Sequence, residues 1–69
     1  MDLLTIGKRV KDIRINKLKL TQEDFAKKLN LDRAYLSRLE CGKQNITIEM
    51  LITICEDGLG VSLKEFFDF

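Results

Sequence analysis

Two helical patterns in this chain are separated by only two residues, Asn30 and Leu31. The first pattern begins at Thr21, whose hydroxyl can cap the free amides at a helix start. The second pattern occupies residues 32–40. Two helices connected so tightly must cross steeply, and Ala26 is the small residue that would let the second helix pass close to the first. The sequence therefore predicts a helix-turn-helix.

The residues at the turn and around the second helix fit this interpretation. Asn30 directly follows the first helix, and asparagine is among the few residues that tolerate a positive φ. Asp32 is the predicted N-cap of the second helix, and Gly42 is predicted to end it. Leu36 and Leu39 have the spacing of an inward-facing pair, so the opposite face of this helix should be exposed to solvent.

Helical patterns account for the rest of the chain as well, and proline is absent. The three further helices are predicted over residues 3–18, from a Thr47 cap to Asp57-Gly58, and from the Ser62–Glu65 capping box through Phe67. The predicted fold is therefore a single all-α domain of five short helices that spans residues 1–69.

The side-chain chemistry excludes several classes of site. The chain has no histidine, and its two cysteines, Cys41 and Cys55, cannot by themselves supply the ligands of a zinc site. We expect Cys55 to pack in the core and Cys41 to lie at a helix end. Without histidine or a recognisable nucleophile motif, enzyme activity is not expected. No apolar run is long enough to cross a membrane and no export signal is evident, so we expect a cytoplasmic protein.

The formal net charge of +1 conceals an uneven distribution. Residues 7–19 carry six basic side chains against Asp12 alone, whereas residues 56–69 carry four acidic side chains against Lys64 alone. Such a chain can turn one end toward a polyanion and keep the other away from it. The same charges are equally compatible with a helix face that is simply solvated.

The exposed face of the second helix of the helix-turn-helix suits a DNA major groove. The predicted base-facing residues are Arg33, Ala34, Ser37 and Arg38. Arg33 lies at the helix start, from which side chains reach base edges, and an arginine fork can bind guanine O6 and N7 together. Ala34 can contact a thymine methyl group. Alternatively, Arg33 is only solvated, and Arg38 pairs with Glu40 or Asp32.

A second set of polar residues surrounds this helix and is predicted to contact phosphates. The set comprises Gln22, Tyr35, Lys43, Gln44 and Asn45. Gln22 lies at a helix start, where side-chain and backbone N–H groups can bind a phosphate oxygen. For Tyr35, packing against the core without any phosphate contact is an equally good interpretation.

These segments resemble a known family. TQEDFA at residues 21–26, followed at matching distance by LSRLE-x-G at residues 36–42, is similar to the Cro/CI-type (XRE) DNA-binding domains of phage repressors and small bacterial regulators. The Asn30 loop and the Asp32-Arg33-x-Tyr35 start of the second helix look most like restriction–modification controller proteins. The resemblance implies five helices and a homodimer that binds a two-fold symmetric operator on double-stranded DNA. It also implies a structural ion pair between Arg14 and Glu40. No cofactor is expected.

The chain departs from the family pattern at three places. It has one extra residue between Arg14 and Thr21, where Lys19 replaces the customary glycine, and another before Leu59-Gly60. Ala34 stands where related controllers tend to carry threonine. The first two departures affect the predicted helix ends, and the third affects the DNA sequence that would be read.

The C-terminal aromatic residues provide an independent indication of dimerisation. Phe66, Phe67 and Phe69 lie within four residues, and one face of so short a helix cannot bury all three, so they are predicted to form a dimer interface. Alternatively, Phe66 and Phe67 fill the core while Phe69 frays.

A competing function is a helical protein-interaction module, such as an antitoxin or a phage regulatory partner.

Overall fold

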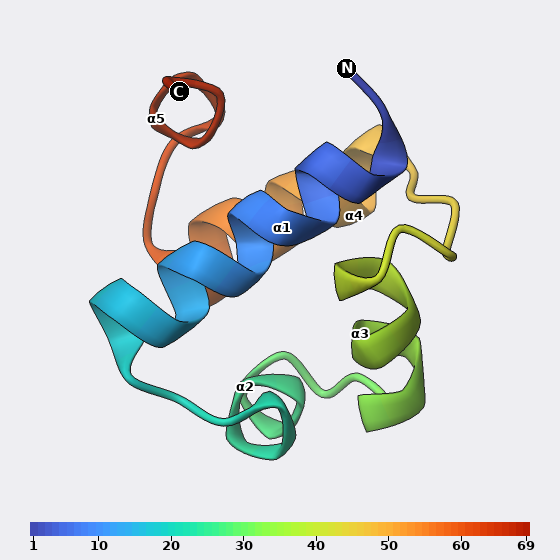
Figure 1. Ribbon diagram of the computed structural model, residues 1–69. Coiled ribbons are helices and arrows are strands. Elements are labelled where there is room, and N and C mark those ends of the chain that lie inside the picture. Colours follow the sequence, from blue (N-terminus) through green and yellow to red (C-terminus); the bar gives the residue numbers. More distant parts are fainter.

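The structure, a computed structural model, describes all 69 residues as helices and short connections, with no strand (Figure 1). The elements are α1 (Leu3–Ile13), η1 (Arg14–Leu18), α2 (Gln22–Lys28), α3 (Arg33–Glu40), α4 (Ile48–Thr53), η2 (Ile54–Leu59) and α5 (Leu63–Phe66), where η marks a π-helical segment. α1 crosses the middle of the molecule with α4 behind it and α2 and α3 beside it. The predicted all-α fold of five helices is confirmed.

Every predicted N-cap is formed. The side chains of Thr21, Asp32, Thr47 and Ser62 each accept a hydrogen bond from a backbone amide in the first turn of their helix. Ser62 and Glu65 form a complete capping box. α1 has an N-cap that was not predicted from the sequence: the Asp2 side chain accepts a hydrogen bond from the Thr5 amide at 2.9 Å. Hydrogen bonds from the Thr5 amide and hydroxyl hold the pKa of the Asp2 carboxyl below its usual value.

Two π-helical turns lie where the resemblance predicts extra residues. The first helix ends as η1, where the Lys19 amide bonds to the Arg14 carbonyl, and the fourth ends as η2, where the Gly60 amide bonds to the Cys55 carbonyl. An i→i+5 bond encloses one residue more than the i→i+4 bond of an α-helix. Each π turn can therefore hold one additional residue within its helix, and Lys19, at φ 58°, takes the left-handed conformation that ends η1.

The predicted end of the fourth helix at Asp57-Gly58 is wrong. Helical structure continues through Leu59, and Gly60 takes the terminating left-handed conformation with φ 71°. Gly58 serves packing instead, since a Cβ atom there would lie 2.9 Å from side-chain atoms of both Phe25 and Leu29. A glycine near a helix end can thus have either role, and only the packing against α2 distinguishes them.

A single core lies between the helices. Its buried apolar residues are Val10, Ile13, Phe25, Ala26, Leu36, Leu39, Leu51, Ile54, Cys55, Leu59, Val61 and Phe66. α1 packs closely on α3 because Gly7 has no side chain: a Cβ atom there would lie 2.3 Å from the Leu39 carbonyl oxygen. Gly42 ends α3 as predicted, with φ 73°, and a Cβ atom there would lie 2.7 Å from the Leu4 Cα atom.

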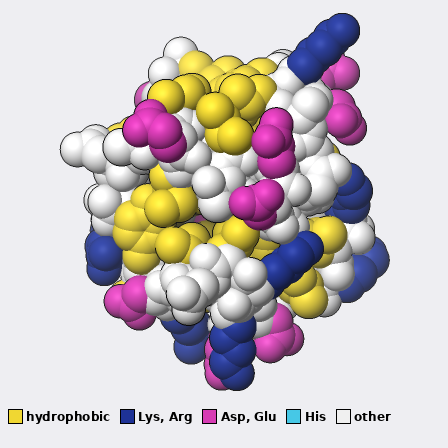
Figure 2. All heavy atoms as spheres, turned by 180° about the vertical axis from the view of Figure 1, so that it is seen from behind, with side chains coloured by type: hydrophobic (Ala, Val, Ile, Leu, Met, Phe, Trp, Pro, Cys, Tyr) yellow, Lys and Arg dark blue, Asp and Glu magenta, His cyan; other side chains and the backbone are white.

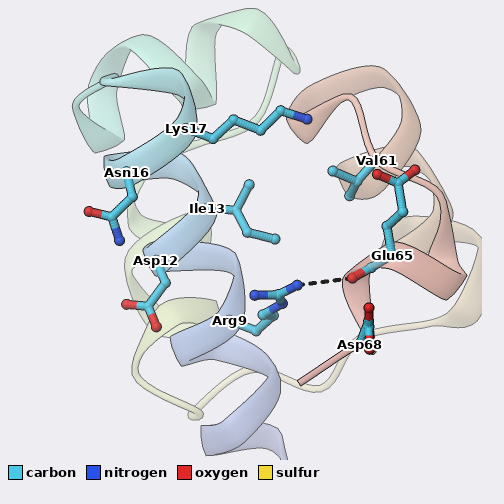
Figure 3. Close-up of a pocket in the computed structure, with 8 residues that line it drawn as sticks. All are labelled: Arg9, Asp12, Ile13, Asn16, Lys17, Val61, Glu65 and Asp68. Carbon is cyan, nitrogen blue, oxygen red and sulfur yellow. Dashed lines mark hydrogen bonds between the residues drawn. The ribbon is translucent and has the colours of Figure 1, made fainter.

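The basic and acidic segments do not lie at opposite ends of the molecule. Arg9 donates to the carbonyls of Glu65 and Phe66 at 2.9 and 2.7 Å, and Lys17 donates to the carbonyl of Gly60 at 3.3 Å. Figure 3 shows these two side chains reaching from α1 and η1 across an open groove of 410 Å³ toward α5 and Val61. Two of the basic side chains, those of Arg9 and Lys17, therefore bond to carbonyls at the ends of neighbouring helices, so the basic run does not form one continuous surface for a polyanion.

Candidate nucleic-acid interface

α2 and α3 form the helix-turn-helix, joined by a short turn after Lys28 (Figure 1). Asn30 has the predicted positive φ of 55°, and the following amide of Leu31 donates to the Ala26 carbonyl at 2.8 Å. Ala26 is only 2% exposed, as expected for a small residue placed between the two helices. The turn therefore holds α3 at a steep angle across α2.

α3 buries one face and exposes the other. Leu36 and Leu39 lie in the core, whereas Arg33, Ala34 and Arg38 are exposed and Ser37 is half-buried. These four positions recur at the spacing of one helical face. Arg33 makes no hydrogen bond or ion pair within the chain, so its guanidinium is available to a ligand.

Arg38 makes neither of the ion pairs considered from the sequence. Its Nε donates instead to the Gln44 Oε1 at 3.0 Å, while Glu40 points into the protein and Asp32 caps its own helix. The two terminal nitrogens of Arg38 have no partner in the chain. Both arginines of α3 thus present free donors on the exposed face.

A buried polar network fixes the end of α3 against η1 and α2. Arg14 Nε and Nη2 donate to the two carboxylate oxygens of Glu40 at 2.7 and 2.9 Å, and Nη1 donates to the Leu20 carbonyl at 2.7 Å. Gln22 Nε2 adds a third hydrogen bond to the Glu40 carboxylate at 2.9 Å. The ion pair implied by the resemblance is therefore present, with 6% of the Arg14 side chain and 2% of that of Glu40 exposed.

The five residues predicted to contact phosphates differ in their surroundings. Lys43 and Asn45 are exposed after α3, whereas Tyr35 is half-buried and packs against the core. Gln22 is half-buried with its amide oriented by Glu40. Gln44 is also half-buried, and its amide is bonded on both sides within the chain. All five lie in α3, just after it, or, for Gln22, against its last residue. Their phosphate contacts stay predictions.

The three C-terminal phenylalanines do not share one environment. Phe66 is fully buried in the core, so its assignment to a dimer interface is wrong. Phe67 is 36% exposed and packs edge-on against Phe66, with ring centroids 5.0 Å apart. Phe69 is 62% exposed, and the Arg9 guanidinium lies 5.1 Å from its ring centroid. Phe67 and Phe69 thus remain as exposed aromatic surface.

Further apolar surface was missed by the sequence analysis. Ile48 at the start of α4 is 57% exposed, and Leu4 in α1 is 48% exposed. Figure 2, which views the molecule from the side of α4, shows hydrophobic areas interrupted by acidic side chains, with most basic side chains nearer the edge. Helical spacing alone did not reveal the exposure of Ile48, because it lies three and seven residues before the buried Leu51 and Cys55.

The two cysteines differ in exposure. Cys41 is exposed at the end of α3 and Cys55 is buried, as expected, and both are free thiols. Burial, with the nearby Glu56 carboxylate, raises the pKa of the Cys55 thiol to about 11, so it stays protonated near neutral pH. No helix of the structure is long and apolar enough to span a membrane.

Comparisons with known proteins agree with this geometry. A helix-turn-helix family model matches residues 10–66. Control protein C.MunI of a Mycoplasma species is 41% identical over 64 residues, which cover 93% of this chain and 85% of that protein. Control protein C.BamHI of Bacillus amyloliquefaciens is 35% identical over 66 residues, which cover 96% of this chain and 80% of that protein.

A solved structure adds a spatial comparison. The wild-type restriction–modification controller protein C.Esp1396I is 44% identical and superimposes with a TM-score of 0.84, covering 96% of this chain and 84% of that protein. The same controller protein has been solved as a tetramer in complex with its natural 35 base-pair operator.

Proposed function

Because the chain belongs to the Cro/CI-type helix-turn-helix DNA-binding family, we propose that it is a dimeric transcriptional regulator that binds a two-fold symmetric operator, of the restriction–modification controller type. The observation that carries the proposal is the exposed face of α3, where two arginines with free donors flank Ala34 and Ser37. The proposed function involves no catalysis. A regulator that binds operator DNA would act in the cytoplasm.

Each exposed residue of α3 has a role that its chemistry supports. Arg33 lies in the first turn of α3, and its unpaired guanidinium can bind guanine O6 and N7 in the major groove. Ala34 offers a methyl group to a thymine methyl, and Ser37 a hydroxyl to either base edge. Arg38, one turn further along the helix, would read a neighbouring base.

Phosphate contacts would set the position of α3 in the groove. Gln22, Tyr35, Lys43 and Asn45 surround the helix-turn-helix, and such contacts fix register without reading sequence. The Gln22 amide is held by Glu40, which leaves one N–H of that amide for a phosphate oxygen. Arg14 neutralises the Glu40 carboxylate behind it, so the phosphate does not meet an uncompensated negative charge.

A dimer is required because one α3 reads only half of a symmetric site. Dimeric helix-turn-helix proteins place their two recognition helices about one DNA turn apart, ~34 Å. In this proposal Phe67 and Phe69 contribute to the dimer contact, since each is an exposed aromatic side chain at the same end of the molecule. The operator complex of C.Esp1396I supports the transfer of this mode of action.

Selection of bound sequences from random duplexes, followed by mobility-shift titrations at increasing salt, tests the proposal. We expect a two-fold symmetric consensus and an affinity that falls steeply with salt, because counterions are released from the phosphates. Arg33→Ala should abolish sequence preference but retain weak nonspecific binding, whereas Lys43→Ala should weaken binding to all sequences alike.

Two results would count against this function. If no duplex is shifted even at low salt, the chain is better explained as a protein-interaction module. If Arg33→Ala loses specific and nonspecific binding equally while its circular dichroism is unchanged, Arg33 does not read bases. Circular dichroism of each variant separates loss of binding from loss of folding.

A further inference from the structure

The loop after α3 folds back onto the last turn of that helix. Gly42, at φ 73°, reverses the chain, and its amide donates to the Leu39 carbonyl at 3.1 Å. The next amide, that of Lys43, donates to the Arg38 carbonyl at 2.8 Å. These two backbone hydrogen bonds therefore fix the position of residue 44 relative to Arg38.

The Gln44 side chain continues this connection. Its Oε1 accepts from Arg38 Nε at 3.0 Å, and its Nε2 donates to the Asn45 carbonyl at 3.2 Å. Arginine Nε can only donate and a carbonyl can only accept, so the amide has a single orientation that satisfies both partners. Gln44 itself is half-buried, and both of these hydrogen bonds lie at the surface of the protein.

This contact determines which edge of the Arg38 guanidinium is free. Nε is occupied by Gln44, and Nη1 and Nη2 have no partner in the chain. The edge formed by the two terminal nitrogens carries two parallel N–H donors, the arrangement that matches guanine O6 and N7. A long side chain held in this way also loses less conformational freedom when it binds.

We propose that Gln44 is a positioning residue for DNA recognition: it holds the Arg38 guanidinium through Nε so that the Nη1–Nη2 edge reads a guanine in the major groove. This inference rests on the proposed function, and it replaces the phosphate contact predicted for Gln44 from the sequence. The inference is based on the two hydrogen bonds by which the oxygen and the nitrogen of the Gln44 amide are held within the chain.

The test compares Gln44→Met, which keeps the length of the side chain but removes its acceptor, with Arg38→Met and with the double variant. Each is titrated against the selected operator, against operators substituted at single base pairs, and against a nonspecific duplex. We expect Gln44→Met to bind the operator about 3- to 10-fold more weakly, the factor that one net hydrogen bond supplies.

The pattern of the loss identifies a positioning role. Gln44→Met should reduce discrimination at the same base pair of each half-site as Arg38→Met, with nonspecific binding and its salt dependence unchanged. The double variant should be no weaker than Arg38→Met alone, because the two residues act as one unit. Lys43→Met, from the same loop, is the matched control and should weaken all duplexes alike.

Three results would overturn the inference. Gln44→Met could bind like the wild type, it could weaken all duplexes equally as Lys43→Met is expected to do, or its loss could add to that of Arg38→Met. Failure of the proposed function is distinguishable from each of these, because in that case the wild-type protein itself selects no DNA sequence.

Discussion

Removing the Glu40 carboxylate should destabilise the domain more than its single ion pair suggests. In Glu40→Ala the Arg14 guanidinium stays buried with only the Leu20 carbonyl as partner, and the Gln22 amide loses its acceptor. Breaking a buried pair by removal of one partner costs about 3–5 kcal/mol, because the remaining charge is left uncompensated. The total stability of a 69-residue domain is about 3–10 kcal/mol, so this loss removes about a third of it or more.

The double variant Arg14→Met/Glu40→Leu separates this explanation from general disruption of the core. It removes both charges and replaces them with apolar side chains of similar volume, a change that is often neutral or stabilising in other proteins. Leu20 and Gln22 are only half-buried, so their freed polar groups can turn to water. We therefore expect the double variant to recover most of the stability lost in Glu40→Ala.

Urea unfolding followed by circular dichroism measures these differences, with all variants at one protein concentration because the stability of the proposed dimer would depend on concentration. The exposed pair Lys27–Glu23, at 3.4 Å, provides a matched control: Lys27→Ala should change the free energy of unfolding by less than about 0.5 kcal/mol. A loss of less than about 1 kcal/mol in Glu40→Ala, or a double variant no more stable than the single one, would refute the reasoning.

Three further changes test the packing, the turn and the core. Gly7→Ala places a Cβ atom 2.3 Å from the Leu39 carbonyl oxygen and should cost about 1–3 kcal/mol or more, measured by the same urea titration. Lys19→Gly removes the strain of φ 58° and should raise the melting temperature by about 2–4 °C, after allowance for the greater freedom of glycine in the unfolded chain. A thiol reagent at pH 8 should label Cys41 at once and Cys55 only on unfolding, because Cys55 is buried and the pKa of its thiol is about 11; equal labelling rates would contradict the buried core position.

The structure links stability to recognition through one residue. Glu40 ends α3, accepts both hydrogen bonds of the buried Arg14 fork, and orients the Gln22 amide at the start of α2. The same carboxylate thus holds the recognition helix against the core and prepares one of the proposed phosphate contacts. Variants at this position are therefore expected to lose folding and DNA binding together.

Local chemistry determined much of this fold before any tertiary contact was considered. Caps depend on a side chain and an amide only two or three residues apart, so Thr21, Asp32 and Thr47 could be assigned directly. The positive φ of Asn30 follows from the short turn in the same way. The spacing of the leucines in α3 determined its exposed face for the same reason, since one helix turn relates the positions.

What the sequence could not determine depends on residues far apart in the chain. Gly58 and Gly60 are indistinguishable until α2 is packed against η2, and Phe66 and Phe67 until the core is closed. The sequence could not show that Arg9 bonds within the protein, because the carbonyls that accept from it belong to residues more than 50 positions away. Local periodicity determined which helices form and which face of α3 is exposed; long-range packing decided which of the polar side chains remain free to bind DNA.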